Sequence, residues 1–437
     1  MSEDNKGICK DSELKKVLKP IHLWGIAVGL VISGDFYGFS YGFMSGGPVS
    51  MLVSFIPVTI MYVTFIFCYT ELATSIPNAG GASAYARRAM GKFAGYITGI
   101  SVLIAFLVSP CAVAISEGKL LNYLLPSVPP SVATAVFFCF FVVINLFGVK
   151  SSSVMEIVVT LIALSGIVLF AIIAAPHFEA GNFLAGTPFA SGFSGVAGAM
   201  TFSMWFYFAI DGAAMNAEEM RDPKRDIPRG YIPAIITLMI SASISMFFTA
   251  GIADYKEVAK VDFPLVKSLE LAIGVGSVWP KVIAVISLFS MVASFSAIIL
   301  ALSRQTYALG RDGYMPAFLS KLNKWGSPSY GLLVPGAISF FLAMTGKTDT
   351  MVIISVFAAI IMYMMSIISL FILRRKEPNL SRPFKVAYPI VPIISLITVV
   401  LLFVCAFVYY IEILIWVVIV YAAAICYYLL YARNHIK

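Results

Sequence analysis

The chain has 437 residues, of which 60% are hydrophobic and only 12% are charged, and its formal net charge is +8. A soluble protein cannot bury so much apolar surface, so the composition predicts an all-α polytopic membrane protein with the lipid bilayer as its surroundings. The polar N-terminus lacks the short apolar core and the small-residue cleavage site of a cleavable signal.

Apolar runs of membrane-spanning length recur twelve times and predict 12 transmembrane helices. A tail of residues 1–20 precedes them, and a short tail of residues 433–437 follows. The predicted spans are residues 21–44, 49–74, 93–118, 132–148, 153–175, 194–219, 231–252, 278–305, 330–346, 350–373, 387–410 and 412–432.

Lysine and arginine residues are unevenly divided between alternate loops. Of the 30 in the chain, 24 fall in the two tails and the loops on their side, and six fall on the opposite side. The positive-inside rule therefore predicts that both termini are cytoplasmic, in a protein of the cytoplasmic (inner) membrane. Because the positive charge follows the topology, we expect no nucleic-acid partner.

The first apolar run contains an interruption, VISGDFYGFSYGF at residues 31–43. Gly34, Gly38 and Gly42 weaken a helix, and a carboxylate such as Asp35 costs at least ~3 kcal/mol at the bilayer centre. Irregular backbone at that depth survives only beside a protein cavity, so the stretch predicts a broken helix at a midplane binding site. The alternative is a glycine-kinked helix in which Asp35 caps the second half.

The sixth run has a matching interruption, TFSMWFYFAIDGAAMNAEEM, in which Asp211 follows the aromatic cluster Trp205 to Phe208. Asp35 and Asp211 are 176 residues and five spans apart, so the second unit enters from the opposite side of the membrane. This arrangement predicts a five-plus-five inverted repeat with broken helices 1 and 6; Asp211 as a simple half-helix cap is the alternative. The predicted units are residues 21–175 and 194–373, followed by two further helices in 387–432.

Several other acidic residues lie in or near the predicted spans. We expect Glu71, Glu117 and Glu412 to be hydrated or paired, whereas Glu156 is either an interfacial acid or a proton carrier. The longest loop of the opposite side, residues 254–277, has the pattern of short amphipathic helices and is either a lid over the outer vestibule or an inert connector.

The chain shows no sign of enzymatic chemistry. Its cysteines and histidines lack metal-ligand or catalytic spacing, so we expect no metal, no cofactor and no catalytic residues. A membrane enzyme would need a nucleophile–base pair, and a sensor would need a soluble output domain; neither is found. Without an ATP-binding loop, the expected driving force of a transporter is a gradient.

Four loop motifs resemble those of the amino acid–polyamine–organocation permease superfamily. They are YTELATSIPNAGGASAYARRAMG (69–91), EEMRDPKRDIPRGYIPA (218–234), SRQTYALGRDGYMP (303–316) and LRRKEPNLSRPFKV (373–386). Within the superfamily, the ethanolamine permeases are the nearest resemblance, through GLVISGDFYGFSYG (29–42), MYVTFIFCYTEL (61–72) and FAIDGAAMNAEEM (208–220).

This resemblance implies a LeuT-type fold and alternating access. It places a small-residue motif of the first helix on Ile32-Ser33-Gly34, where Ile32 replaces an expected glycine, and the aromatic gate and acid of the sixth helix on Trp205 and Asp211. Some proton-coupled relatives carry a lysine in span five, but residues 154–166 have none, so that coupling device is expected to be absent.

The chemistry of the interruptions predicts the substrate. Asp35 stands where an amino-acid carboxylate would sit, and at ~4 Å with an effective dielectric near 20 two carboxylates repel by ~4 kcal/mol. An ammonium group is instead attracted, and each aromatic face adds perhaps ~1–2 kcal/mol unless the ring merely packs or faces lipid. We expect Asp211, beside an apolar wall, to matter more than Asp35. The predicted substrate-binding residues are Ser33, Gly34, Asp35, Phe36, Tyr37, Trp205, Phe208 and Asp211.

The sequence therefore predicts a secondary active transporter that imports a small cationic amino alcohol, ethanolamine, with protons as a candidate coupling ion. The alternative is a cationic amino acid or polyamine permease or exchanger of the same superfamily.

Overall fold

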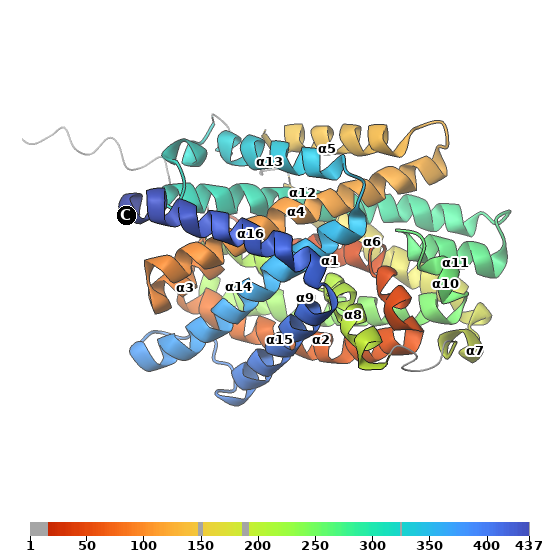
Figure 1. Ribbon diagram of the computed structural model, residues 1–437, viewed down its shortest axis with the longest axis horizontal. Coiled ribbons are helices and arrows are strands. Elements are labelled where there is room, and N and C mark those ends of the chain that lie inside the picture. Colours follow the sequence, from red (N-terminus) through yellow and green to blue (C-terminus); the bar gives the residue numbers. More distant parts are fainter. Residues whose placement is uncertain (1–15, 147–151, 186–191, 324–325, 437) are drawn as a thin grey trace, which may run out of the picture.

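The computed structural model describes residues 16–146, 152–185, 192–323 and 326–436, and over these residues the fold is built of helices (Figure 1). Nine of the described helical segments are long and apolar enough to cross a membrane, and three shorter apolar helices accompany them. The prediction of an all-helical polytopic membrane protein is confirmed. The main helices are α1 (Pro20–Ile32), α2 (Tyr41–Ser75), α4 (Lys92–Leu124), α5 (Pro130–Leu146), α6 (Ser152–Ala174), α8 (Gly192–Ser203), α9 (Pro223–Gly251), α12 (Trp279–Arg311), α13 (Ser329–Ala343), α14 (Thr348–Lys376), α15 (Ile390–Tyr409) and α16 (Ile411–Tyr427).

Short helices connect these segments. At the left of Figure 1, in what we call the basic end, lie α3 and the C-terminal α17; at the right, in what we call the lid end, lie α7, α10 and α11. The 254–277 segment does form short helices, as predicted. The short elements are η1 (Ser33–Asp35), α3 (Ala82–Met90), η3 (Ala175–His177), α7 (Ala180–Phe183), η4 (Met204–Phe206), η5 (Ile210–Glu219), α10 (Tyr255–Val258), α11 (Pro264–Ile273), η6 (Ala317–Ser320), η7 (Tyr428–Ala432) and α17 (Arg433–His435).

Several helices extend past the predicted spans. Helix α9 begins at Pro223, before the predicted 231, because proline suits the first helical turn and Asp226 complements the positive N-terminal end of the helix. Helix α12 continues to Arg311, past the predicted 305. These polar turns carry the helices beyond the apolar layer, which hydropathy alone does not detect.

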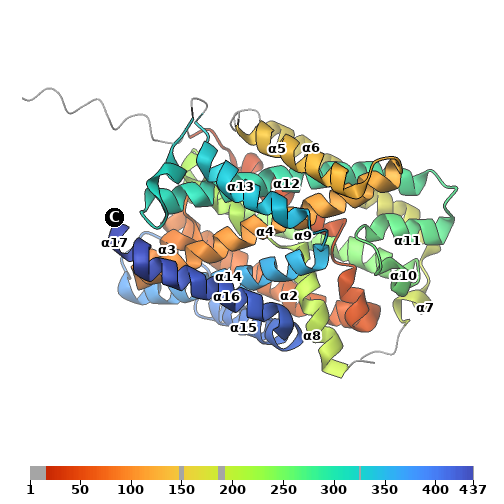
Figure 2. The same ribbon diagram turned by 45° about the horizontal axis from the view of Figure 1, so that its top comes forward.

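The helices pack around a central α1. It contacts α6, α9 and α12 and is buried along most of its length. Helices α5 and α13 pack beside α4 along the upper side of Figure 1, and α15 and α16 lie on another side of the bundle, as the tilted view of Figure 2 also shows. Helix α1 is therefore enclosed by protein and not by lipid.

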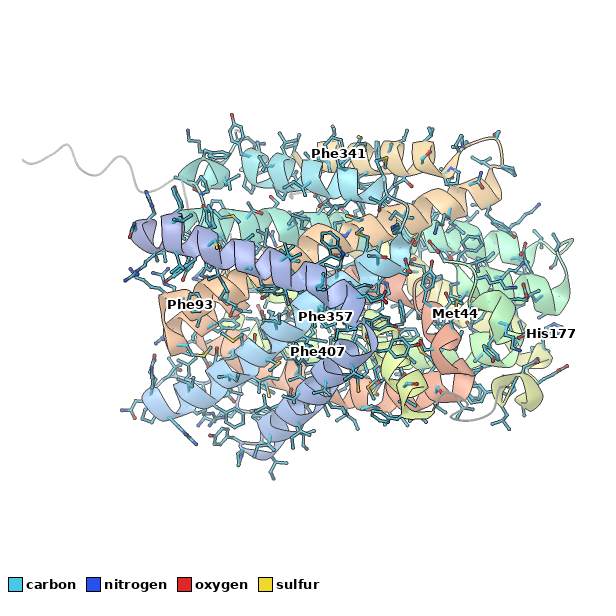
Figure 3. The ribbon with its side chains drawn as sticks, viewed as in Figure 1. Met44, Phe93, His177, Phe341, Phe357 and Phe407 are labelled. Atoms are coloured by element: carbon cyan, nitrogen blue, oxygen red, sulfur yellow. The ribbon has the colours of Figure 1, made fainter. Side chains whose placement is uncertain are left out.

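Large apolar side chains cover the outside of the bundle (Figure 3). Met44 is 68% exposed and Phe341 is 72% exposed, and Phe93 and Phe407 are also exposed. In contrast, Phe357 of α14 is fully buried. An apolar exterior of this kind is suited to contact with lipid chains.

Candidate functional site

Two interrupted helices meet in the interior of the bundle. The first interruption follows α1 and runs through η1 to Ser40; the second follows α8 and runs through η4 to Ala209, where η5 begins. Each contains a residue in the left-handed region: Gly38 with φ +82° and Ala209 with φ +73°. Among the described residues, Ala209 is the one non-glycine residue with positive φ. Because this conformation costs an alanine roughly 1–2 kcal/mol, surrounding contacts must hold it in place.

The two interruptions touch at Gly34 and Trp205. A Cβ atom on Gly34 would clash with the backbone carbonyl oxygen of Trp205, so only glycine fits at that point. The Trp205 ring contacts Tyr37 edge-on at 6.0 Å and stacks on Phe208 at 4.9 Å. The structure thus brings together four of the predicted site residues: Gly34, Tyr37, Trp205 and Phe208.

Of the other predicted site residues in the first interruption, Phe36 is directed toward another helix, whereas the side chain of Ser33 faces the Tyr37 hydroxyl and stays beside the Trp205 cluster. The Ser33 amide donates to the Ser294 hydroxyl of α12 at 3.2 Å. The Phe36 ring reaches α6, where a Cβ on Gly166 would lie 3.5 Å from its Cζ. Phe36 therefore packs against the scaffold and is not part of the Trp205 cluster.

Asp35 is fully buried, and neither of its carboxylate oxygens has a hydrogen-bond partner among the described residues. The alternative that it caps the second half-helix is wrong, because nearby amides already have acceptors. The Phe36 and Tyr37 amides donate to the Ser33 carbonyl at 2.9 and 3.1 Å, and the Gly38 amide donates to the Asp262 carbonyl at 3.2 Å. These amides are likewise not free for a substrate carboxylate.

Asp211 is buried in a more polar environment. Its Oδ1 accepts a hydrogen bond from the Tyr363 hydroxyl at 3.3 Å, while Oδ2 has no partner within the described part of the chain. The Tyr231 hydroxyl contacts the backbone carbonyls of Ile210 and Asp211 at 3.2 and 3.1 Å. The Tyr363 hydroxyl therefore adds one polar contact to the buried surroundings expected for Asp211, because η5 turns its side chain toward α14.

Three buried tyrosines, which we call the tyrosine cluster, extend from Asp211. Tyr62 of α2 contacts Tyr363 of α14 through their hydroxyls at 3.1 Å, and the Tyr62 ring lies 5.1 Å from that of Tyr207. The sequence analysis did not place them in the site: Tyr62 lies in α2 well past its break at Gly46 and Gly47, and Tyr363 lies in α14. In a sequence, such residues are recognisable as tyrosines inside an apolar span, because a buried hydroxyl needs a hydrogen-bond partner.

Asp35 lies near the other side of this cluster. It interacts electrostatically with Tyr207, and the hydroxyl of Ser241 on α9 faces it. The Tyr207 hydroxyl is itself 2.8 Å from the Thr59 hydroxyl of α2. A chain of contacts through Tyr363, Tyr62 and Tyr207 therefore connects the two aspartates.

Four intramembrane carboxylates have no cationic partner among the described residues, and each has at least one buried oxygen without a hydrogen bond: Asp35, Glu117, Glu156 and Asp211. Removing such groups from water is expensive unless a cation or a proton compensates them.

Other buried acids are paired. As expected for Glu71, an ion pair with Arg374 at 2.7 Å holds it at the basic end. Glu219 pairs with Arg304 at 2.6 Å at the same end. Among the described residues, these two acids of the basic end therefore have cationic partners, whereas the four named above do not.

The lid end is closed over the first interruption by Asp262, which joins α10 to α11. Its carboxylate accepts hydrogen bonds from Tyr41, from Ser116 at 3.2 Å and from Thr348 at 2.7 Å. The Lys119 ammonium lies 2.8 Å from the same group. The 254–277 segment is thus fastened to α4, α14 and the broken helix, as a lid would be.

Comparison with known proteins places these features in a family context. The profile of a family described as amino acid permease matches residues 18–431. The chain is 24% identical to the branched-chain amino acid permease BcaP of Bacillus subtilis (strain 168), over 98% of this chain and 95% of that protein. It is 25% identical to the methylthioribose transporter of the same organism, again over 98% and 95%, and 28% identical to its amino-acid permease RocC, over 75% and 73%.

Proposed function

The chain belongs to the amino acid permease family, and from that premise we propose that it is a secondary active transporter that imports a small organic cation, with ethanolamine as the substrate. Membership confirms the resemblance at the level of the superfamily and identifies a permease for amino acids or related solutes, not an enzyme. The narrower resemblance to ethanolamine permeases belongs to the proposal. The relatives' names include branched-chain amino acids and methylthioribose, so the choice of substrate rests on the site.

The observation that carries the proposal is the pair of buried aspartates at the tyrosine cluster. Neither Asp35 nor Asp211 has a cationic partner in the described part of the chain, and at least one oxygen of each lacks a hydrogen bond. An ammonium group supplies both the missing charge and the missing donors. The aromatic faces of Tyr62, Tyr207 and Tyr363 add cation–π attraction of about 1–2 kcal/mol in a desolvated site.

A substrate carboxylate has no comparable partner. The amides of Phe36, Tyr37 and Gly38 are satisfied by backbone carbonyls, and Asp35 repels a second anion. The site therefore favours an amine without a carboxylate, which describes ethanolamine and excludes simple zwitterionic amino acids.

The transport cycle proposed with this site is alternating access in a five-plus-five inverted repeat with 12 membrane crossings. Supporting it are the two interruptions five predicted spans apart and their direct contact at Gly34 and Trp205. We place the basic end and both termini in the cytoplasm, following the loop charges. In a background without native cysteines, Asn379→Cys should then be protected from an impermeant thiol reagent outside the cell, while Lys260→Cys should be labelled; the reverse pattern would overturn the orientation.

The alternative substrate is a cationic amino acid or a polyamine. A longer dication would use both aspartates at once. Competition of unlabelled polyamines and cationic amino acids against ethanolamine uptake distinguishes this alternative from ethanolamine.

The experiment is uptake of radiolabelled ethanolamine by proteoliposomes. Excess unlabelled ethanolamine should compete fully, while alanine, leucine and methylthioribose should compete poorly. Competition by putrescine or lysine stronger than by ethanolamine itself would favour the alternative. Full competition by alanine at equal concentration would refute the electrostatic argument.

A further inference from the structure

Helix α6, the fifth of the main helices in chain order, presents the Glu156 carboxyl group to the backbone of α1. Glu156 is 3% exposed, and its Oε1 lies so close to α1 that a Cβ on Gly29 would clash with it. One turn earlier, Gly25 meets Ile157 in the same way, at 2.7 Å from the position of a Cβ. The two glycines form a groove in α1 that receives α6 at Glu156.

The contact lies a few residues before the first interruption and is connected to it. The carbonyl of Gly29 accepts a hydrogen bond from the Ser294 hydroxyl at 2.6 Å, and that hydroxyl accepts the Ser33 amide at 3.2 Å. Thr160, one turn along α6 from Glu156, donates to the Gly25 carbonyl at 3.4 Å. Any movement of α1 away from α6 therefore changes the surroundings of Glu156 and the start of the broken segment together.

The Glu156 carboxyl has no compensation in this packed arrangement. Its Oε1 has no hydrogen-bond partner among the described residues. In the part of the chain that the structure describes, no lysine or arginine of the neighbouring helices α1, α9 and α12 pairs with it, and its burial disfavours the charged form. A neutral carboxylic acid fits such a place, whereas a carboxylate does not.

We propose that Glu156 is a proton-binding site of this transporter, distinct from the substrate site, and that its protonation permits α1 and α6 to pack together. When α1 separates from α6, water reaches the carboxylate and it ionises. Repacking requires that an O–H bond form on Glu156 with a proton taken from the open side. Because Oε1 lies against the α1 backbone, a proton fits between the helices and a metal cation does not. The coupling to substrate transport rests on the proposed function.

Transport tests the coupling. The solution outside the proteoliposomes is made one pH unit more acidic than the lumen, so that protons flow inward, and the membrane potential is clamped at zero. The parent protein should accumulate ethanolamine toward about tenfold, because one proton moves with each substrate. Glu156→Gln mimics the neutral acid and should lose this stimulation while retaining exchange of labelled for unlabelled ethanolamine. Glu156→Asp should retain the stimulation, and Glu412→Gln, at an exposed carboxyl on α16, is the matched control.

Infrared spectroscopy tests proton binding without any substrate, which separates a failure of this inference from a failure of the proposed function. At neutral pH, the spectrum of the parent minus that of Glu156→Gln should contain a carbonyl band of a protonated carboxylic acid, and the parent minus Glu412→Gln should not. Absence of this band from the first difference spectrum would refute the assignment, whatever bands the other buried carboxyls contribute to both proteins. Stimulation by the pH difference that persists in Glu156→Gln would also overturn the proposal. So would a parent protein whose uptake is driven by a sodium gradient and a Glu156→Gln variant that loses this sodium-driven uptake.

Discussion

The two interrupted helices each hold one buried aspartate, but the two carboxylates differ in the hydrogen-bond donors around them. Within the described residues neither oxygen of Asp35 has a partner at hydrogen-bond distance; the Ser241 hydroxyl faces the carboxylate, and the nearby amides already have acceptors. Asp211 accepts a hydrogen bond from Tyr363, which in turn contacts Tyr62. A carboxylate with a fixed donor depends less on an incoming ligand than one without any. If the proposed cationic substrate binds here, we expect Asp35 to contribute the larger share of its attraction, whereas the sequence led us to expect Asp211 to matter more.

The largest expected effect is therefore that of Asp35→Asn. The variant keeps the shape of the side chain and removes the charge, and ethanolamine affinity should fall by about 3–4 kcal/mol, roughly 10²- to 10³-fold. A binding titration of the purified protein in detergent measures it. An affinity within threefold of the parent would show that the ammonium is held elsewhere.

Asp211→Asn should have a smaller effect, about 2 kcal/mol or roughly 30-fold in affinity. Its remaining oxygen still accepts from Tyr363, so less is lost. The same titration applies, and the comparison is decided by the ranking of the two variants. If Asp211→Asn binds ethanolamine more weakly than Asp35→Asn, the hydrogen bond from Tyr363 does not reduce the dependence of Asp211 on the ligand, contrary to our inference.

Tyr363→Phe removes the donor and should weaken binding by about 1 kcal/mol. Double-mutant cycles sharpen the comparison, because only neighbours couple. The effect of Tyr363→Phe should be non-additive with Asp211→Asn and additive with Asp35→Asn. Equal coupling to both aspartates would indicate that the tyrosine cluster acts as one unit.

Much of this architecture follows from local sequence. The helices and both interruptions were predictable because apolar runs and glycine clusters act over a few residues, and the contact of Gly34 with Trp205 agrees with the paired motifs. The isolation of Asp35 was not predictable, since one of the occupied amides, that of Gly38, has its acceptor at the distant Asp262. The contribution of Tyr363 depends on how α14 packs, which no local pattern specifies.

The remaining substitutions concern the backbone of the two interruptions and test folding stability, where the previous ones test binding. Gly38→Ala should lower the thermal stability, because alanine is strained at φ +82° by roughly 1–2 kcal/mol and its Cβ would lie 3.1 Å from the Trp205 ring. Ala209→Gly relieves the same strain at φ +73° in the folded protein, but glycine also makes the unfolded chain more flexible, which costs about 0.5–1 kcal/mol. Because these two effects oppose each other, the variant should change stability little. Thermal unfolding of the two variants in one detergent measures both; a loss in Ala209→Gly as large as that in Gly38→Ala would contradict the strain argument.

The fastening of the lid at Asp262 has a consequence for the kinetics of opening. One carboxylate receives Tyr41, Ser116, Thr348 and Lys119, which belong to three different helices. None of these partners can leave gradually, since each loss exposes the remaining buried charge to a less favourable environment. Opening at this end should therefore occur as an all-or-none event with a steep temperature dependence, and under the proposed transport cycle it should limit the turnover rate for every substrate.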